Sequence, residues 1–133
     1  MTGRGEPVFV YGTLRGGASN HFRMAGARFI AAGTIRGRMY RIDWYPGLVV
    51  DPAGDDLAGE VYEVGPALLA ELDVFEGLSA GEIEGSEYRR VRVRVDLAGD
   101  DRPPVWAWVW EWLGPVDEAK RITGGDWLLE SPI

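Results

Sequence analysis

Two segments in which side chains alternate along the chain constrain the fold most strongly. In residues 88–97, apolar residues at 91, 93, 95 and 97 alternate with Arg90, Arg92, Arg94 and Asp96. This period of two predicts a strand with one buried and one solvated face. In residues 105–112, four tryptophans share one face, and Val105, Ala107, Val109 and Glu111 share the other. Since both faces of this second segment are largely apolar, we expect a strand covered on both sides.

The remaining pattern predicts several short strands and few helices. Residues 7–11 and 59–64 are expected strands, and residues 29–42 form one or two strands broken at Gly33 or Gly37. Residues 51–56 are expected to be a polar loop, and a short helix is expected from about residue 19 to 26. Pro66 and Gly77 bracket a helix over residues 66–76, because proline favours the first helical position and glycine the position after the end. The pattern predicts a small α+β fold with a curved or closed sheet, and residues 1–133 as a single domain.

Composition excludes several kinds of chemistry. The chain has no cysteine and a single histidine, so thiol nucleophiles, disulfides and cysteine-bound zinc are excluded. His21 is interpreted as a surface or capping residue. A net charge of −7 disfavours nucleic acid and anionic membranes as partners. No apolar run approaches the roughly 20 residues of a membrane span, and the polar N-terminus does not resemble a signal peptide, so we expect a cytoplasmic protein.

The glycine-rich loop after the first expected strand resembles a phosphate-binding loop without its lysine. Residues 12–19 match the glycine and hydroxyl positions of G-x-x-x-x-G-K-[ST], but Ala18 stands where the lysine belongs. The missing cation disfavours nucleotide hydrolysis. Backbone N–H groups in such a turn bind carboxylates as well as phosphates, although a plain glycine turn is also consistent with the pattern.

Glu76 is the candidate acid/base. Leu69, Leu72 and Glu76 share one side of the expected helix, and Leu68, Leu72 and Phe75 form a second apolar stripe. Burial and the helix C-terminus would both raise the pKa of Glu76 toward neutrality. The alternative is that Glu76 points outward or pairs with an arginine such as Arg90.

Other acidic residues give weaker indications. Glu76 with Glu60 or Glu111 could form the carboxylate pair of a glycosidase, but a sequence with 21 acidic residues always offers such pairs. The cluster of Glu82, Glu84 and Glu87 is interpreted as a solvated acidic loop.

Several motifs in order along the chain resemble the γ-glutamylcyclotransferase-like superfamily, which includes γ-glutamylamine cyclotransferases and AIG2-like proteins. The first is Val-Phe-Val-Tyr-Gly-Thr-Leu-Arg-Gly-Gly at residues 8–17. It is followed by Tyr-Pro-Gly-Leu at 45–48, Gly-Glu-Val-Tyr at 59–62, Leu-Asp-Val-Phe-Glu-Gly at 72–77 and Tyr-Arg-Arg at 88–90. Residues 122–127, Ile-Thr-Gly-Gly-Asp-Trp, complete the series.

The resemblance implies a mixed β-barrel with a few short helices and an enzyme that needs neither metal nor cofactor. It implies a small γ-glutamyl substrate that is cyclised to 5-oxoproline, with Glu76 as general acid/base. The implied substrate-binding residues are Tyr11, Gly12, Thr13, Leu14 and Tyr88. We expect a monomer or a homodimer. A binder of a small acidic metabolite without turnover, or an acidic interaction module that uses the tryptophan strand, remain the alternatives.

Overall fold

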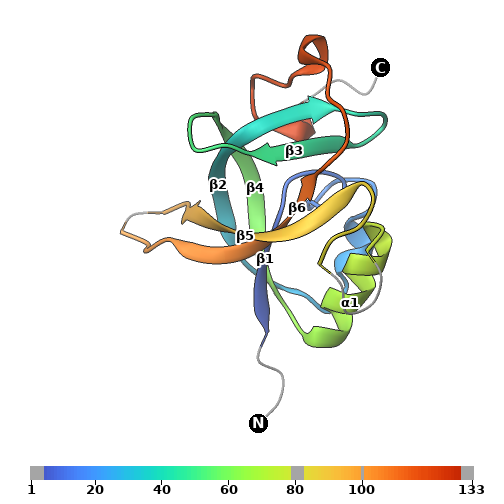
Figure 1. Cartoon of the computed structure of the whole chain (residues 1–133). Helices are drawn as coiled ribbons and strands as arrows, with labels where there is room; N and C mark the ends of the chain where they lie inside the picture. The colour runs from blue at the N-terminus through green and yellow to red at the C-terminus, as the bar shows by residue number, and fades with distance from the viewer. Residues whose placement is uncertain (1–4, 79–82, 100, 130–133) are drawn as a thin grey trace.

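The computed structural model describes residues 5–78, 83–99 and 101–129, in which the strands build one closed sheet (Figure 1). The strands are β1 (Glu6–Val10), β2 (Arg28–Arg41), β3 (Pro46–Val50), β4 (Asp55–Val64), β5 (Tyr88–Leu97) and β6 (Val105–Trp112). The helical elements are α1 (Pro66–Phe75) and the 3-10 turns η1 (His21–Met24), η2 (Glu118–Lys120) and η3 (Trp127–Leu129).

Strand pairing closes the sheet into a barrel. The order is β3-β2-β4-β1-β6-β5, and β5 pairs back onto β2. Thus β2, β4, β1, β6 and β5 form the barrel, while β3 extends the sheet beside β2. β1 and β6 pair in parallel. The other strand pairs of the sheet are antiparallel. The mixed barrel expected from the sequence is confirmed.

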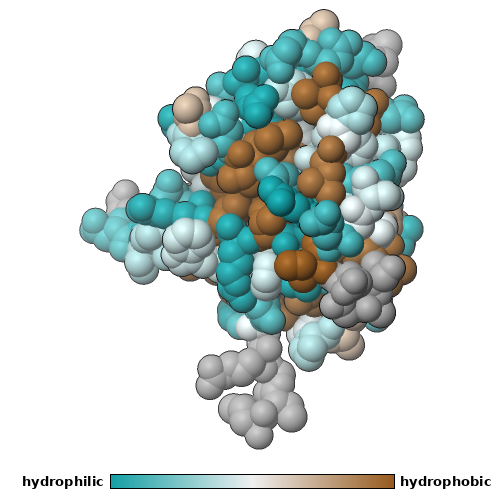
Figure 2. All heavy atoms as spheres, in the orientation of Figure 1, coloured by the Kyte–Doolittle hydropathy of each residue, from teal (hydrophilic) through white to brown (hydrophobic). Residues whose placement is uncertain are grey.

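In the hairpin of β5 and β6, β5 follows the predicted alternation, whereas the expected cover on both sides of β6 fails near its start, where Trp106 is 60% exposed. Val93 and Val95 are buried, and Arg92, Arg94 and Asp96 are exposed. Figure 2 shows hydrophilic residues covering the end of this hairpin that projects from the barrel. Arg90 differs from the prediction, because its side chain is only 11% exposed and pairs with Asp73 on α1.

β2 runs without a break past Gly33 and Gly37, contrary to the sequence-based expectation. Both glycines allow close approach of neighbouring chains. A Cβ atom at Gly33 would lie 2.7 Å from Cγ1 of Val95, and one at Gly37 would lie 2.6 Å from the carbonyl oxygen of Val49. β4 begins at Asp55 rather than residue 59, because residues 55–58 pair with β2.

α1 begins and ends as predicted, with Pro66 in its first turn and Gly77 at a φ of 91° just after it. Its inward side is built from Leu69 and Leu72, whereas Leu68 and Phe75 are only partly buried. The expected helix at 19–26 is the single 3-10 turn η1, which lies beside α1 (Figure 1), with the Arg23 guanidinium 4.1 Å from the Phe75 ring centroid. No helix within the described ranges is long and apolar enough to cross a membrane.

Candidate active site

A pocket of about 230 Å³ opens where the chain leaves β1 and where α1 ends. Each site residue named from the sequence lines it: Tyr11, Gly12, Thr13, Leu14, Glu76 and Tyr88. The remaining wall is mostly aromatic or apolar and is formed by Phe9, Val10, Trp44, Tyr45, Pro46, Phe75, Gly77, Glu87 and Trp110. Segments that are far apart in the sequence therefore meet around one concave site.

The loop after β1 has its carbonyl oxygens engaged within the protein. The Gly12 oxygen accepts from the Arg15 N–H at 3.1 Å, and the Thr13 oxygen from the Asn20 N–H at 2.8 Å. Nδ1 of His21 lies 2.9 Å from the Leu14 oxygen, so His21 is part of the loop's support rather than an ordinary surface residue. The N–H groups of Thr13 and Leu14 donate to no acceptor among the described residues. A turn with occupied carbonyls and available N–H groups favours a bound anion.

Glu76 follows the last residue of α1 and is held there by the backbone. Its N–H donates to the Leu72 oxygen at 2.9 Å, and Gly77 then turns the chain away. Within the described part of the chain, no basic side chain forms an ion pair with the Glu76 carboxyl group. Burial, and secondarily the negative charge of Asp73, raise the pKa of Glu76 to about 8. Such a group both accepts and donates protons near neutral pH.

The two tyrosines of the site have hydroxyl groups that are already hydrogen-bonded. Tyr11 donates to the Trp110 oxygen at 2.8 Å, and Tyr88 donates to the Pro46 oxygen at 3.0 Å. Burial is the main cause that raises the pKa of each phenol above its usual value, and the charge of Glu76 adds to it. Both tyrosines are therefore neutral at physiological pH, and their hydrogen bonds fix the wall of the pocket.

Gly12 allows the loop to pack against β3. A Cβ atom at this position would lie 2.6 Å from Cγ of Pro46. A side chain at Gly12 would therefore collide with Pro46, so substitution would displace the loop itself.

The carboxylates that could have paired with Glu76 are occupied elsewhere. Glu60 accepts hydrogen bonds from Arg15, Gly16 and Tyr62, and Glu111 binds Arg89 and the N–H of Val50. Neither is among the described residues that line the pocket, so the glycosidase interpretation has no support. Glu84 and Glu87 are exposed as expected for a solvated loop, and Glu82 lies outside the described residues.

Comparison with known proteins identifies the family. The model of the family "Gamma-glutamyl cyclotransferase, AIG2-like" matches residues 8–129. The chain belongs to this family. Within it, the Escherichia coli gamma-glutamylcyclotransferase family protein YtfP is 34% identical over 122 residues, which cover 91% of this chain and 95% of the relative. A Bos taurus gamma-glutamylaminecyclotransferase is 36% identical over 110 residues, or 74% of this chain and 61% of the relative.

A solved structure of another AIG2-like protein agrees with this assignment. The Mus musculus protein superposes with a TM-score of 0.72 at 25% identity. The superposition covers 95% of this chain and 84% of the mouse chain. As a member of the γ-glutamyl cyclotransferase, AIG2-like family, the chain is a cyclotransferase-type enzyme. The buried support of its loop, Arg15 with Glu60 and Asp126, escaped the sequence-based reasoning. The only signal for it was an arginine inside a glycine-rich turn.

Proposed function

We propose that this enzyme cyclises a small γ-glutamyl amine or γ-glutamyl amino acid to 5-oxoproline and releases the free amine. The observation that carries the proposal is the pairing of two features in one pocket. Glu76, whose pKa is raised to about 8, lines this pocket together with Thr13 and Leu14, whose N–H groups donate to no acceptor within the described ranges.

The proposed reaction is intramolecular. The Glu76 carboxylate takes a proton from the substrate's α-ammonium group, and the resulting amine attacks the γ-carbonyl carbon. The new C–N bond closes a five-membered lactam and the bond to the leaving nitrogen breaks. The attacking nitrogen gives up two protons in all, one before and one after attack, and Glu76 passes them in turn to the leaving nitrogen, which departs as an ammonium group. A carboxylate whose pKa is raised to about 8 is a much stronger base than an ordinary one with a pKa of roughly 4.3, so it can take a proton from the α-ammonium group and return one to the leaving nitrogen.

The binding loop supplies the other half of the proposal. We assign the N–H groups of Thr13 and Leu14 to the substrate's α-carboxylate, which is the anion present in every γ-glutamyl compound. Fixing this end, with Tyr11 and Tyr88 in the wall, would fold the glutamyl chain so that amine and carbonyl meet. Well-held intramolecular attack reaches effective molarities on the order of 10⁵–10⁸ M, so positioning accounts for much of the rate.

The test is to incubate the purified protein with γ-glutamyl amines, γ-glutamyl amino acids and glutathione fragments, and to quantify 5-oxoproline. Release from at least one of these compounds, lost in a folded Glu76→Gln variant, is the expected result. Full activity of Glu76→Gln would contradict the acid/base assignment. Binding of 5-oxoproline without any turnover across the panel would instead favour a non-catalytic binder.

A further inference from the structure

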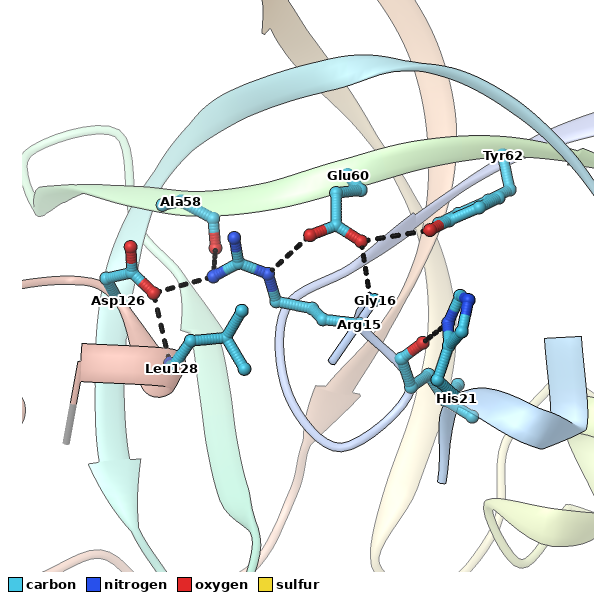
Figure 3. A network of polar contacts seen from close by, with 9 residues as sticks. Arg15, Gly16, His21, Ala58, Glu60, Tyr62, Asp126 and Leu128 are labelled. Carbon is cyan, nitrogen blue, oxygen red and sulfur yellow. Dashed lines mark hydrogen bonds and ion pairs between the residues drawn. The ribbon is translucent and has the colours of Figure 1, made fainter. Parts of the chain in front are cut away.

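A largely buried ionic network supports the binding loop (Figure 3). Arg15 is 8% exposed, and its side chain lies between two carboxylates from distant parts of the chain. Nε donates to Oε2 of Glu60 on β4 at 3.0 Å, and Nη1 donates to Oδ1 of Asp126 at 2.7 Å. Arg15 therefore ties the loop after β1 to both the barrel wall and the segment that leads into η3.

The network also reaches the loop backbone. Oε1 of Glu60 accepts a hydrogen bond from the N–H of Gly16 at 2.9 Å and another from the Tyr62 hydroxyl at 3.0 Å. The Arg15 N–H closes the turn onto the Gly12 oxygen at 3.1 Å. The same residue thus anchors the turn through its side chain and shapes it through its backbone.

A buried ion network of this kind contributes little net stability, because desolvation of the charges offsets their attraction. Its directional hydrogen bonds instead select one geometry for the groups attached to it. The groups attached here are residues 12–16, and within that stretch Thr13 and Leu14 line the pocket and have N–H groups that donate to no acceptor in the described part of the chain.

We propose that Arg15 is a positioning residue which, through Glu60 and Asp126, holds the loop in the shape that presents the Thr13 and Leu14 N–H groups to an anionic ligand. The residue itself is not among those that line the pocket. The ligand part of this inference rests on the proposed function, whereas the loop part can be measured on the free protein.

The experiment compares Glu60→Gln and Asp126→Asn with a matched control, Glu111→Gln. Glu111 resembles Glu60 in its hydrogen bonds, since it accepts from an arginine Nε at 2.9 Å and from a backbone N–H, that of Val50, at 2.8 Å. It is 6% exposed and its hydrogen bonds go to Val50 and Arg89 rather than to residues 12–16, so the control reports the effect of removing a buried charge that does not bond to the loop.

Two readouts are measured on each variant. In the free protein, amide hydrogen exchange at Arg15 and Asn20 should accelerate about tenfold or more in the two loop variants, because their bonds to the Gly12 and Thr13 oxygens loosen. The Kd for 5-oxoproline, by calorimetry, should rise about tenfold or more for the same variants, since small misplacements of binding groups reduce affinity strongly. For a γ-glutamyl compound that turns over, kcat/KM should fall, because both the binding and the positioning of the substrate depend on the loop.

The inference is supported if these changes occur in Glu60→Gln and Asp126→Asn but not in Glu111→Gln. It is overturned if exchange at Arg15 and Asn20 is unchanged in both loop variants, or if Glu111→Gln has the same effect. Faster exchange in the loop variants, together with no 5-oxoproline binding by the unmodified protein, would support the positioning role and contradict the proposed function.

Discussion

Asp73 pairs with Arg90 at 3.0 Å, one helical turn before Glu76. The Asp73 carboxylate also accepts a hydrogen bond from the Trp110 indole at 2.9 Å, and the Arg90 guanidinium lies 4.2 Å from the Trp108 ring centroid. The arginine that might have neutralised Glu76 is therefore engaged by its neighbour. Glu76 keeps an elevated pKa, and Asp73 contributes to it through its charge.

The first prediction concerns the pH dependence of the reaction. Since the carboxylate form of Glu76 is proposed to start catalysis, kcat/KM should increase with pH up to about 8. Asp73→Asn should move this acid limb to lower pH, because it removes one source of the raised pKa. The limb should still lie above the pKa of an ordinary carboxyl group, because burial remains the larger cause.

Rate profiles and the carboxyl titration of Glu76 by NMR check this prediction. Asp73→Asn also leaves Arg90 without its partner, so its stability must be verified at each pH. A limb that does not move, or that moves to higher pH, in a folded Asp73→Asn protein would contradict the electrostatic argument.

The second prediction concerns stability. The pKa of Glu76 is raised from 4.5 to about 8, so the folded state holds its proton more tightly than the unfolded state. The stabilisation from the protonated form is present below pH 4.5 and is lost as the pH rises toward 8. Glu76→Gln, which cannot ionise, should therefore become more stable relative to the unmodified protein across this window, by a few kcal/mol at most.

Urea unfolding of both proteins at pH 5 and pH 8.5 measures this difference. A difference in the free energy of unfolding between the two proteins that stays constant with pH would show that Glu76 does not titrate abnormally. Other groups titrate equally in both proteins and cancel in the comparison.

The third prediction concerns the wall of the pocket. Tyr88→Phe removes the hydrogen bond to the Pro46 oxygen, and this bond is buried. We expect a loss of about 1 kcal/mol in unfolding free energy and weaker binding of 5-oxoproline, because the segment at Tyr45 and Pro46 is released. Urea unfolding and calorimetry provide the two measurements. If neither the unfolding free energy nor the affinity for 5-oxoproline changes, the Tyr88 hydroxyl does not hold the wall of the pocket.

The fourth prediction concerns the turn that follows Glu76. The Gly77 N–H donates to the Val74 oxygen and the Leu78 N–H to the Asp73 oxygen, and Gly77 has a φ of 91°. Gly77→Ala should destabilise the fold by about 1 kcal/mol through backbone strain alone, since a Cβ atom there meets nothing within 4 Å. Because the turn fixes Glu76, kcat should also fall.

Gly124→Ala is the matched control for Gly77→Ala. A Cβ atom at Gly124 also meets nothing within 4 Å, and Gly124 is not among the glycines with positive φ. Thermal unfolding of both variants should show a loss only for Gly77→Ala. Equal losses would mean that backbone conformation is not the cause.

The sequence predicted the elements whose signal is local. The alternation in residues 88–97 and the bracketing of α1 by Pro66 and Gly77 both reflect short-range geometry, and both elements formed as expected. The continuity of β2 was missed because a glycine can mark a break or a close approach. Only the tertiary neighbours, Val95 and Val49 here, distinguish the two.

For the candidate site, too, the features that depend on distant residues could not be predicted from local patterns. The proximity of Glu76 to the loop followed from family motifs, since spacing alone left the direction of Glu76 open. The role of Arg15 depends on Glu60 and Asp126, which lie 45 and 111 residues further along the chain. Partners at such separations leave no periodic trace in the sequence. For the same reason Arg90 was wrongly predicted to face solvent, because its partner Asp73 lies on another element.

The pairing of β2 with β5 has a consequence for how the protein reaches its native state. It joins Gly33 to Leu97 and Thr34 to Asp96, and is thus a contact of high sequence separation. Closing a loop of that length is entropically expensive, so proteins rich in such contacts fold slowly. The pocket takes Pro46 from β3 and Tyr88 from β5, which stand at opposite ends of the strand order, and so it is complete only once the barrel has closed. In a refolding experiment, binding of 5-oxoproline should therefore recover after the secondary structure, as a signal of the last step.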